Sequence, residues 1–211
     1  MSNYFDYIIS LGNDCSVAGS LRKLKFKEAS YPFDWNVTSI NFIYECIINK
    51  FTNIYKIIDK CAISYTKLHY FNEIIFQHEN SDITQREIIK KKYKIRGDRL
   101  HKLCLKNKSI LFVRKGEKDT INDIEKIKNA FESTYPTLNF KILLINNVKN
   151  DNNNLDNIIN YNIDYESFLN INEKKYRAGH RNNKKSYENV YNILSQFSSK
   201  KYVQPKHRDL F

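Results

Sequence analysis

One cysteine stands where a thiol can become a nucleophile. Cys15 follows residues 7–11 and Gly12, and it precedes a stretch in which apolar residues recur at helical spacing. The range 7–11 is short and apolar, which predicts a buried strand, and residues 15–25 predict a helix. Free N–H groups and the dipole at a helix N-terminus stabilise a thiolate. Cys15 is therefore a candidate nucleophile, although the same position also suits a small packed residue.

A thiol nucleophile needs a base, which is usually a histidine. His78 directly follows a predicted strand and is the first choice. His180 lies in a basic, glycine-containing loop and is the second choice. His69 and His101 fall in aromatic or helical contexts that favour structural roles, and His207 belongs to the C-terminal tail.

Carboxylates near these residues have opposite expected effects. Asp14 disfavours a thiolate at Cys15 unless its side chain points away as a helix cap. Asp34 lies between two large aromatic residues, so we expect it to be partly buried and to need a hydrogen-bond partner. It can orient the base histidine or cap the next helix, and the sequence alone favours the cap. With His78 as the base, Asp34 or Glu79 is expected to orient the imidazole.

Several polar side chains are candidates for contacting a substrate. Arginines hold phosphate or carboxylate groups bidentately. Arg114 ends a predicted strand, which favours an anion-binding role, whereas ordinary surface pairing is favoured for Arg96. The predicted substrate-binding residues are Asn13, Arg99, Arg114 and Asn146.

The elements that position these residues predict an α/β fold. Strands are expected at residues 7–11, 72–77, 109–113 and 140–145, with an edge strand within 158–168, and helices at 15–25, 41–51, 84–106, 120–135 and 187–197. Uniformly apolar strands that alternate with helices predict a largely parallel sheet flanked by helices, a Rossmann-like or flavodoxin-like three-layer arrangement. Gly97 is expected to weaken or bend the helix over 84–106.

Parallel strands place their carboxyl ends at one edge, where ligands bind. We therefore expect the residues that follow the four main strands to line one crevice. These residues are 12–15, 78–79, 114–115 and 146–147.

Length and composition indicate a folded, soluble protein. The chain of 211 residues suits one domain over 1–211, with 148–211 as a C-terminal appendage. No apolar run is long enough to span a bilayer, and the N-terminus lacks the features of a signal peptide. A cytoplasmic protein without a membrane partner is expected.

The four cysteines form no CxxC pair, so no zinc site, other metal, cofactor or disulfide is expected. Cys46 and Cys104 lie among apolar helical positions and are predicted to be buried and unreactive.

The formal net charge of +12 has two interpretations. It can indicate contact with a polyanion such as a nucleic acid. Alternatively, an abundance of Lys, Asn, Ile and Tyr is typical of an AT-rich genome, and the spread of the charge along the chain favours this second interpretation.

The chain also resembles a known family in several ordered motifs. Its opening block contains Ser10-Leu11-Gly12, Cys15, Leu21-Arg22 and Pro32-Phe33-Asp34-Trp35. Later matches are Phe76, His78 and Glu79, then Tyr93, Arg96 and Arg99, then Arg114. These motifs resemble the DUF1796 family of putative papain-like cysteine peptidases over roughly residues 7–147. The resemblance implies Cys15 as nucleophile and His78 as base. The papain-like label implies an α+β fold with the cysteine helix against an antiparallel barrel, which is the alternative to the α/β prediction.

These observations predict a cysteine-dependent hydrolase or acyltransferase that works through a thioester. The substrate is open among peptides, isopeptides and other acyl compounds. An SGNH-like esterase is a second enzyme class that the architecture allows. Two classes without catalysis are also compatible with the sequence: a module that binds a phosphate- or sugar-containing ligand, and a basic protein that binds nucleic acid.

Overall fold

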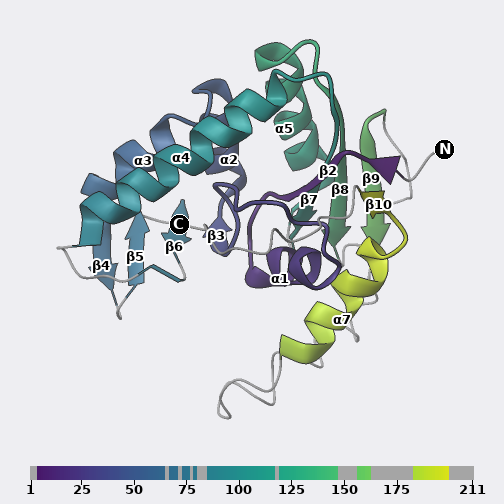
Figure 1. Ribbon diagram of the computed structural model, residues 1–211, viewed down its shortest axis with the longest axis horizontal. Coiled ribbons are helices and arrows are strands. Elements are labelled where there is room, and N and C mark those ends of the chain that lie inside the picture. Colours follow the sequence, from purple (N-terminus) through teal and green to yellow (C-terminus); the bar gives the residue numbers. More distant parts are fainter. Residues whose placement is uncertain are drawn as a thin grey trace.

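The computed structural model describes residues 4–64, 67–70, 73–76, 78–79, 85–116, 119–146, 156–162 and 183–199 (Figure 1). A parallel sheet lies between two layers of helices, and a smaller antiparallel sheet lies beside it. The α/β prediction with a parallel sheet flanked by helices is confirmed.

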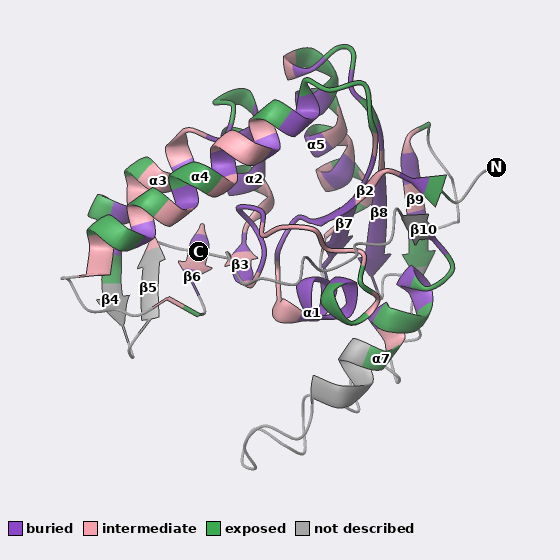
Figure 2. Ribbon diagram, viewed as in Figure 1, coloured by how far each residue is buried: buried purple, intermediate pink, exposed green. Residues whose placement is uncertain are grey.

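The parallel sheet has the strand order β2-β7-β8-β9. Its strands are β2 (Tyr7–Ser10), β7 (Ser109–Lys115), β8 (Asn139–Asn146) and β9 (Ile158–Asn162), and each neighbouring pair is parallel. The two central strands are buried along almost their whole length (Figure 2). Side chains on both faces of β7 and β8 therefore face a core, which explains why these strands are apolar throughout.

Helices cover both faces of this sheet. On one face, α1 (Cys15–Lys23) and α7 (Asn183–Leu194) pack against each other and against residues such as Leu111 and Leu143. On the other face, α2 (Ile40–Ile48) and α5 (Ile121–Thr134) pack on a larger core that contains Phe112 and Ile142. The apolar helical spacing in the sequence thus marks the faces that are buried.

The second sheet is antiparallel and corrects one prediction. Its order is β3-β6-β5-β4, with β3 (Asn36–Thr38), β6 (Ile74–Phe76), β5 (Lys67–Tyr70) and β4 (Ala62–Ser64). The strand predicted over 72–77 is β6, and its place in the parallel sheet is wrong because it pairs antiparallel with β3 and β5. A short apolar run does not by itself specify the direction of its neighbours.

The longest helix among the described residues is α4 (Arg86–Cys104), which packs on α3 (Asn53–Lys56) and the 3₁₀ turn η1 (Ile57–Lys60). The helix is continuous through Gly97, and the expectation that this residue weakens or bends it stays a prediction. A Cβ on Gly97 would lie 2.8 Å from the backbone oxygen of Phe51. Glycine is therefore used here to let two segments approach closely.

The C-terminal part contributes to the same core. The strands β1 (Tyr4–Phe5) and β10 (Ser198–Ser199) pair in parallel, and Val190 and Leu194 of α7 are buried against the α1 face. The division into one domain and an appendage at 148–211 stays a prediction. Among the described residues, no helix is long and apolar enough to cross a membrane.

Candidate functional site

A tight turn places Cys15 at the first position of α1. After β2, Gly12 and Asn13 both have φ of 85°, and Asp14 then caps the helix by accepting a hydrogen bond from the backbone N–H of Ser16 at 2.7 Å. A Cβ on Gly12 would collide with the hydroxyl of Thr38, and its positive φ also favours glycine. The turn requires glycine before the cysteine, and it directs the chain into the helix.

The structure brings Cys15 and His78 together. The Cys15 sulfur lies 3.0 Å from Nε2 of His78, which is within hydrogen-bonding distance although the residues are 63 positions apart. The sulfur also lies 4.0 Å from the backbone oxygen of Trp35, and the Trp35 and His78 rings meet edge to face at 5.7 Å. Because His78 follows β6 and Cys15 follows β2, the pair is formed between the two sheets.

An ion pair between a buried lysine and a partly exposed aspartate lies beside the cysteine. The ammonium of Lys115 is 2.6 Å from Oδ2 of Asp14, and the Lys115 side chain is only 9% exposed. The Asn13 amide donates to the backbone oxygen of Lys115 at 2.5 Å. This pairing compensates the charge of Asp14, which the sequence predicts to oppose a thiolate, and it ties the turn to the end of β7.

The predicted orienting carboxylates have other partners. Asp34 is buried, accepts from the backbone N–H of Tyr31 at 2.7 Å and pairs with Lys27 at 2.7 Å. Glu79 pairs with Lys92 at 2.7 Å and accepts from the Tyr93 hydroxyl at 3.3 Å. Within the described part of the chain, neither carboxylate forms a hydrogen bond with His78.

The prediction that Asp34 caps the following helix is wrong, because Ser39 is the N-cap of α2. A catalytic role for Asp34 stays a prediction, and its contacts favour an indirect one. Its ion pair fixes Lys27, whose ammonium lies 5.1 Å from the centre of the Trp35 ring.

Arg114 occupies an internal position. Its side chain is 2% exposed and pairs with Asp119 at 2.6 Å. It also donates to the backbone oxygens of Leu11 and Thr38 and to the Thr38 hydroxyl, at 2.9–3.2 Å. These contacts favour a structural role, so substrate binding by Arg114 is not supported by its position.

The two predicted asparagines lie at the carboxyl edge of the parallel sheet. Asn146 is fully buried at the end of β8, where its amide is 3.5 Å from the backbone oxygen of Asp119 and its own oxygen lacks a hydrogen bond within the described residues. Asn13 lies in the turn before Cys15. Residues 12–15, 114–115 and 146 thus share one edge of the parallel sheet, and Asn147 is outside the described residues. The expectation that all four strand ends line one crevice is wrong, because Arg114 and Asn146 are buried and residues 78–79 arrive from the antiparallel sheet.

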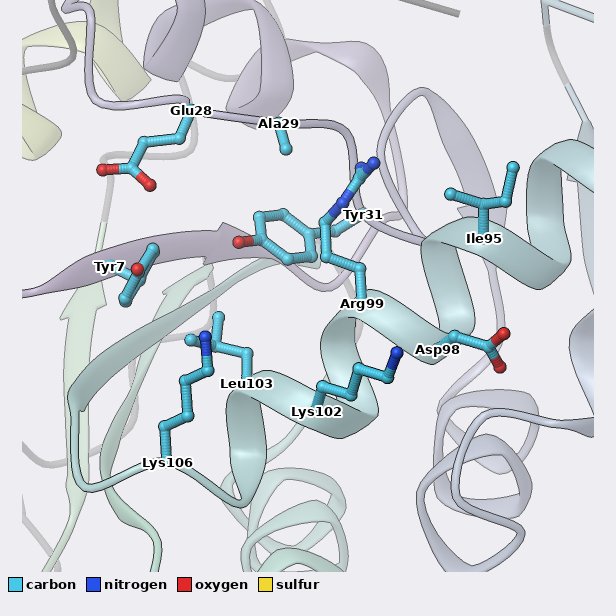
Figure 3. Close-up of a pocket in the computed structure, with 10 residues that line it drawn as sticks. All are labelled: Tyr7, Glu28, Ala29, Tyr31, Ile95, Asp98, Arg99, Lys102, Leu103 and Lys106. Carbon is cyan, nitrogen blue, oxygen red and sulfur yellow. The ribbon is translucent and has the colours of Figure 1, made fainter.

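Arg99 lies in a separate cavity at the opposite edge of the parallel sheet. It donates to the backbone oxygen of Ser30 at 2.6 Å. Figure 3 shows the cavity, of about 470 Å³, between α4, the start of β2 and the loop before β3. Because Tyr7 begins β2 and Cys15 follows its end, this cavity does not place Arg99 beside the cysteine. Contact between Arg99 and a substrate at Cys15 stays a prediction.

The remaining cysteines are buried, as predicted for Cys46 and Cys104. All four cysteines are present as thiols, and Cys15 is the one that is not fully buried. Burial raises the pKa of the Cys104 thiol to about 12, that of Cys61 to about 12, and that of Cys46 well above its ordinary value. At neutral pH these three thiols are protonated, so Cys15 is the candidate for thiol chemistry.

Among the other histidines, His101 is the one whose side chain is described. His101 hydrogen-bonds with Tyr135 at 2.9 Å, which agrees with a structural role. The side chain of His69 and all of His180 and His207 are outside the described residues. Within the described ranges, no group of three or more His, Cys, Asp or Glu residues is arranged to hold a metal ion.

Sequence reasoning missed two residues that shape the site. Trp35 packs on the imidazole, and Lys115 neutralises the helix cap. Trp35 was visible as part of a matching motif, and Lys115 as a residue at a predicted strand end. No local pattern showed what either side chain touches.

Comparison with known proteins supports the motif resemblance. No curated protein and no solved structure matches the chain. A family model described as putative papain-like cysteine peptidase (DUF1796) matches residues 6–150, which is more than half of the chain and includes both Cys15 and His78. The protein therefore belongs to the DUF1796 family of putative papain-like cysteine peptidases.

Proposed function

We propose that the protein is a cysteine-dependent hydrolase or acyltransferase in which Cys15 is the nucleophile and His78 is the base. The observation that carries this proposal is the 3.0 Å distance between the Cys15 sulfur and Nε2 of His78. The position of the sulfur at the first residue of α1 supports it, because the helix dipole favours a negative charge there. The family membership agrees with a peptidase or a related acyl-transfer enzyme.

The reaction assigned to the pair has two halves. His78 accepts the thiol proton, and the Cys15 sulfur attacks the acyl carbon, so that a C–S bond forms and the carbonyl electrons move onto oxygen. Backbone N–H groups in the first turn of α1 are assigned to that oxyanion. The intermediate expels the leaving group, which takes the proton from His78, and leaves a thioester on Cys15.

In the second half, water attacks the thioester carbon while His78 accepts a proton from the water. The C–S bond breaks, and the sulfur regains a proton through His78. An amine or alcohol in place of water gives transfer rather than hydrolysis. Neither half uses the carboxylates of Asp34 or Glu79 directly, in keeping with their contacts to Lys27 and Lys92.

The proposal is tested with an activated ester that does not depend on knowing the natural substrate. Incubation of the full chain with p-nitrophenyl acetate is expected to release p-nitrophenol and to leave an acetyl group on Cys15, located by mass spectrometry. Cys15→Ser and His78→Gln are expected to lose both the release of p-nitrophenol and the acetylation at position 15. Cys104→Ala is expected to keep both, because Cys104 is buried. A Cys15 that reacts with iodoacetamide at pH 6.5 no faster than in the urea-unfolded chain refutes the proposal.

A further inference from the structure

Cations gather on the aromatic ring that supports the candidate base. The Arg22 guanidinium and the Lys27 ammonium each lie 5.1 Å from the centre of the Trp35 ring. The same ring meets His78 edge to face at 5.7 Å, and the backbone oxygen of Trp35 lies 4.0 Å from the Cys15 sulfur. Trp35 therefore connects two positive charges to the Cys15–His78 pair.

Charges around the pair do not balance. The ion pairs Asp14–Lys115, Asp34–Lys27 and Glu79–Lys92 each neutralise one cation. Two further cations have no ion pair within the described residues: Arg22, which is exposed on Trp35, and Arg96, which lies 5.0 Å from the centre of the Tyr93 ring. Among these eight charged groups, the cations outnumber the carboxylates by two.

Arg22 and Arg96 act on the same neighbour. Burial is the largest cause of the lowered pKa of Lys27, and the positive charges of Arg96 and Arg22 lower it further, against the opposing effect of Asp34. Like charges that crowd near a buried ammonium are unfavourable in the free protein. An anion bound among them relieves that repulsion.

The two arginines are suited to hold such an anion. A guanidinium is planar, stacks on aromatic rings and donates bidentately to carboxylate or phosphate oxygens. Because the two guanidinium groups already lie over the Trp35 and Tyr93 rings, each side chain loses less conformational entropy when it binds an anion. The hydroxyl of Tyr93 also contacts Glu79, the residue after His78, which links Arg96 to the same corner of the molecule.

We infer that the substrate at Cys15 is an acyl compound that also carries a carboxylate or phosphate group, and that Arg22 and Arg96 hold this anion. This inference rests on the proposed function, because it names the substrate class of the same site. It assigns to Arg96 a role other than the ordinary surface pairing that its sequence context favours.

Two small alkylating reagents separate this inference from the reactivity of the thiol. Iodoacetate and iodoacetamide both react by displacement, in which the sulfur forms a C–S bond and iodide leaves with the electron pair. Only iodoacetate carries a carboxylate. The measured quantity is the rate with iodoacetate divided by the rate with iodoacetamide at Cys15, normalised to the same ratio in the urea-unfolded chain. The nucleophilicity of the sulfur affects both rates equally and therefore cancels.

The ratio is expected to favour iodoacetate by about fourfold, since each of two charges about 10 Å away in an aqueous dielectric attracts the anion. The double variant Arg22→Gln/Arg96→Gln is expected to bring the ratio back to about one. Lys102→Gln/Lys106→Gln is the matched control, because it removes two charges at the cavity on the other edge of the sheet. Melting curves show whether each variant is folded.

Each outcome has a defined meaning. The inference is overturned if the ratio is unchanged in the arginine variant, or if it falls by the same factor in the lysine control. Either result leaves the proposed function intact. A Cys15 that reacts with neither reagent refutes the proposed function itself. Protection of Cys15 from iodoacetamide by acetate or by inorganic phosphate, at constant ionic strength, assigns the anion to a carboxylate or a phosphoryl group, and protection by neither contradicts the inference.

Discussion

Replacing Lys115 by methionine tests how the helix cap beside the candidate nucleophile is neutralised. The Lys115 side chain is 9% exposed, and its ammonium lies 2.6 Å from the Asp14 carboxylate. Methionine keeps most of the side-chain volume and removes the charge. The uncompensated carboxylate of Asp14 then stands next to Cys15 and disfavours a thiolate there.

The magnitude follows from the geometry. Adjacent residues place their charged atoms about 6 Å apart, where two unit charges interact by ~0.7 kcal/mol in water and by ~3 kcal/mol at an effective dielectric constant of 20. The Asp14 side chain is 37% exposed, so a value between these limits applies. We expect the midpoint of the alkylation rate against pH to rise by about one pH unit in Lys115→Met.

The assay is the rate of iodoacetamide labelling at Cys15 from pH 5 to 9. Lys115→Arg is expected to keep the wild-type profile, and Asp14→Asn in the Lys115→Met background is expected to restore it, because asparagine still caps a helix without a charge. Lys94→Met breaks a comparable pair with Asp98 on α4 and is expected to leave the profile unchanged. A profile that does not move in Lys115→Met, or that the double variant fails to restore, refutes the reasoning.

Three further predictions concern the scaffold. Arg114→Met leaves Asp119 without its buried partner and is expected to lower the free energy of unfolding by about 3 kcal/mol, measured by urea denaturation; a loss below ~1 kcal/mol contradicts the role assigned to the guanidinium. Gly97→Ala places a methyl group 2.8 Å from the Phe51 oxygen and is expected to destabilise the protein despite the higher helix propensity of alanine, so a raised melting temperature contradicts the close packing. Burial raises the pKa of Cys104 to about 12, so the folded state keeps this proton while the unfolded state loses it above about pH 9. The stability that this thiol contributes is therefore present below pH 9 and is lost as the pH rises toward 12. Cys104→Ala is expected to make the decline of the free energy of unfolding between about pH 9 and 12 shallower by up to ~1.4 kcal/mol per pH unit. Equal slopes in the wild type and the variant would exclude Cys104 as the source of the decline.

The elements around Cys15 could be predicted because their signals are local. The strand before Gly12, the capped helix after it and the apolar strands β7 and β8 all show the expected patterns, and their bounds differ from the structure by only a few residues. A parallel sheet follows from such strands because each is buried on both faces. The candidate pair Cys15 and His78 also came from the sequence, and the structure places their side chains in contact.

The antiparallel sheet could not be predicted in the same way. Its strands are three or four residues long, and β3 follows directly after Trp35, which adopts φ of 67°. Strands of this length carry too little periodicity to show their partners. The partners of Asp34, Glu79 and Lys115 depend on contacts between distant segments, so their ion pairs also had no sequence signal.

The position of Arg114 explains how a site between two sheets is held together. Cys15 follows a strand of the parallel sheet, whereas His78 follows a strand of the antiparallel one, so the distance between them depends on how the sheets are joined. The guanidinium donates to Leu11, at the end of β2, and to both the hydroxyl and the backbone oxygen of Thr38, in β3. The Thr38 hydroxyl in turn donates to the backbone oxygen of Leu11 at 3.0 Å. An arginine that the sequence suggested for anion binding thus fixes the two sheets to each other. On one side its contact is Leu11, two residues before Asn13. On the other side its contact is Thr38 in β3, which pairs with β6, the strand that precedes His78. The Arg114→Met variant is therefore expected to slow labelling of Cys15 as well as to destabilise the fold, because the loss of this link changes the distance between the sulfur and the imidazole.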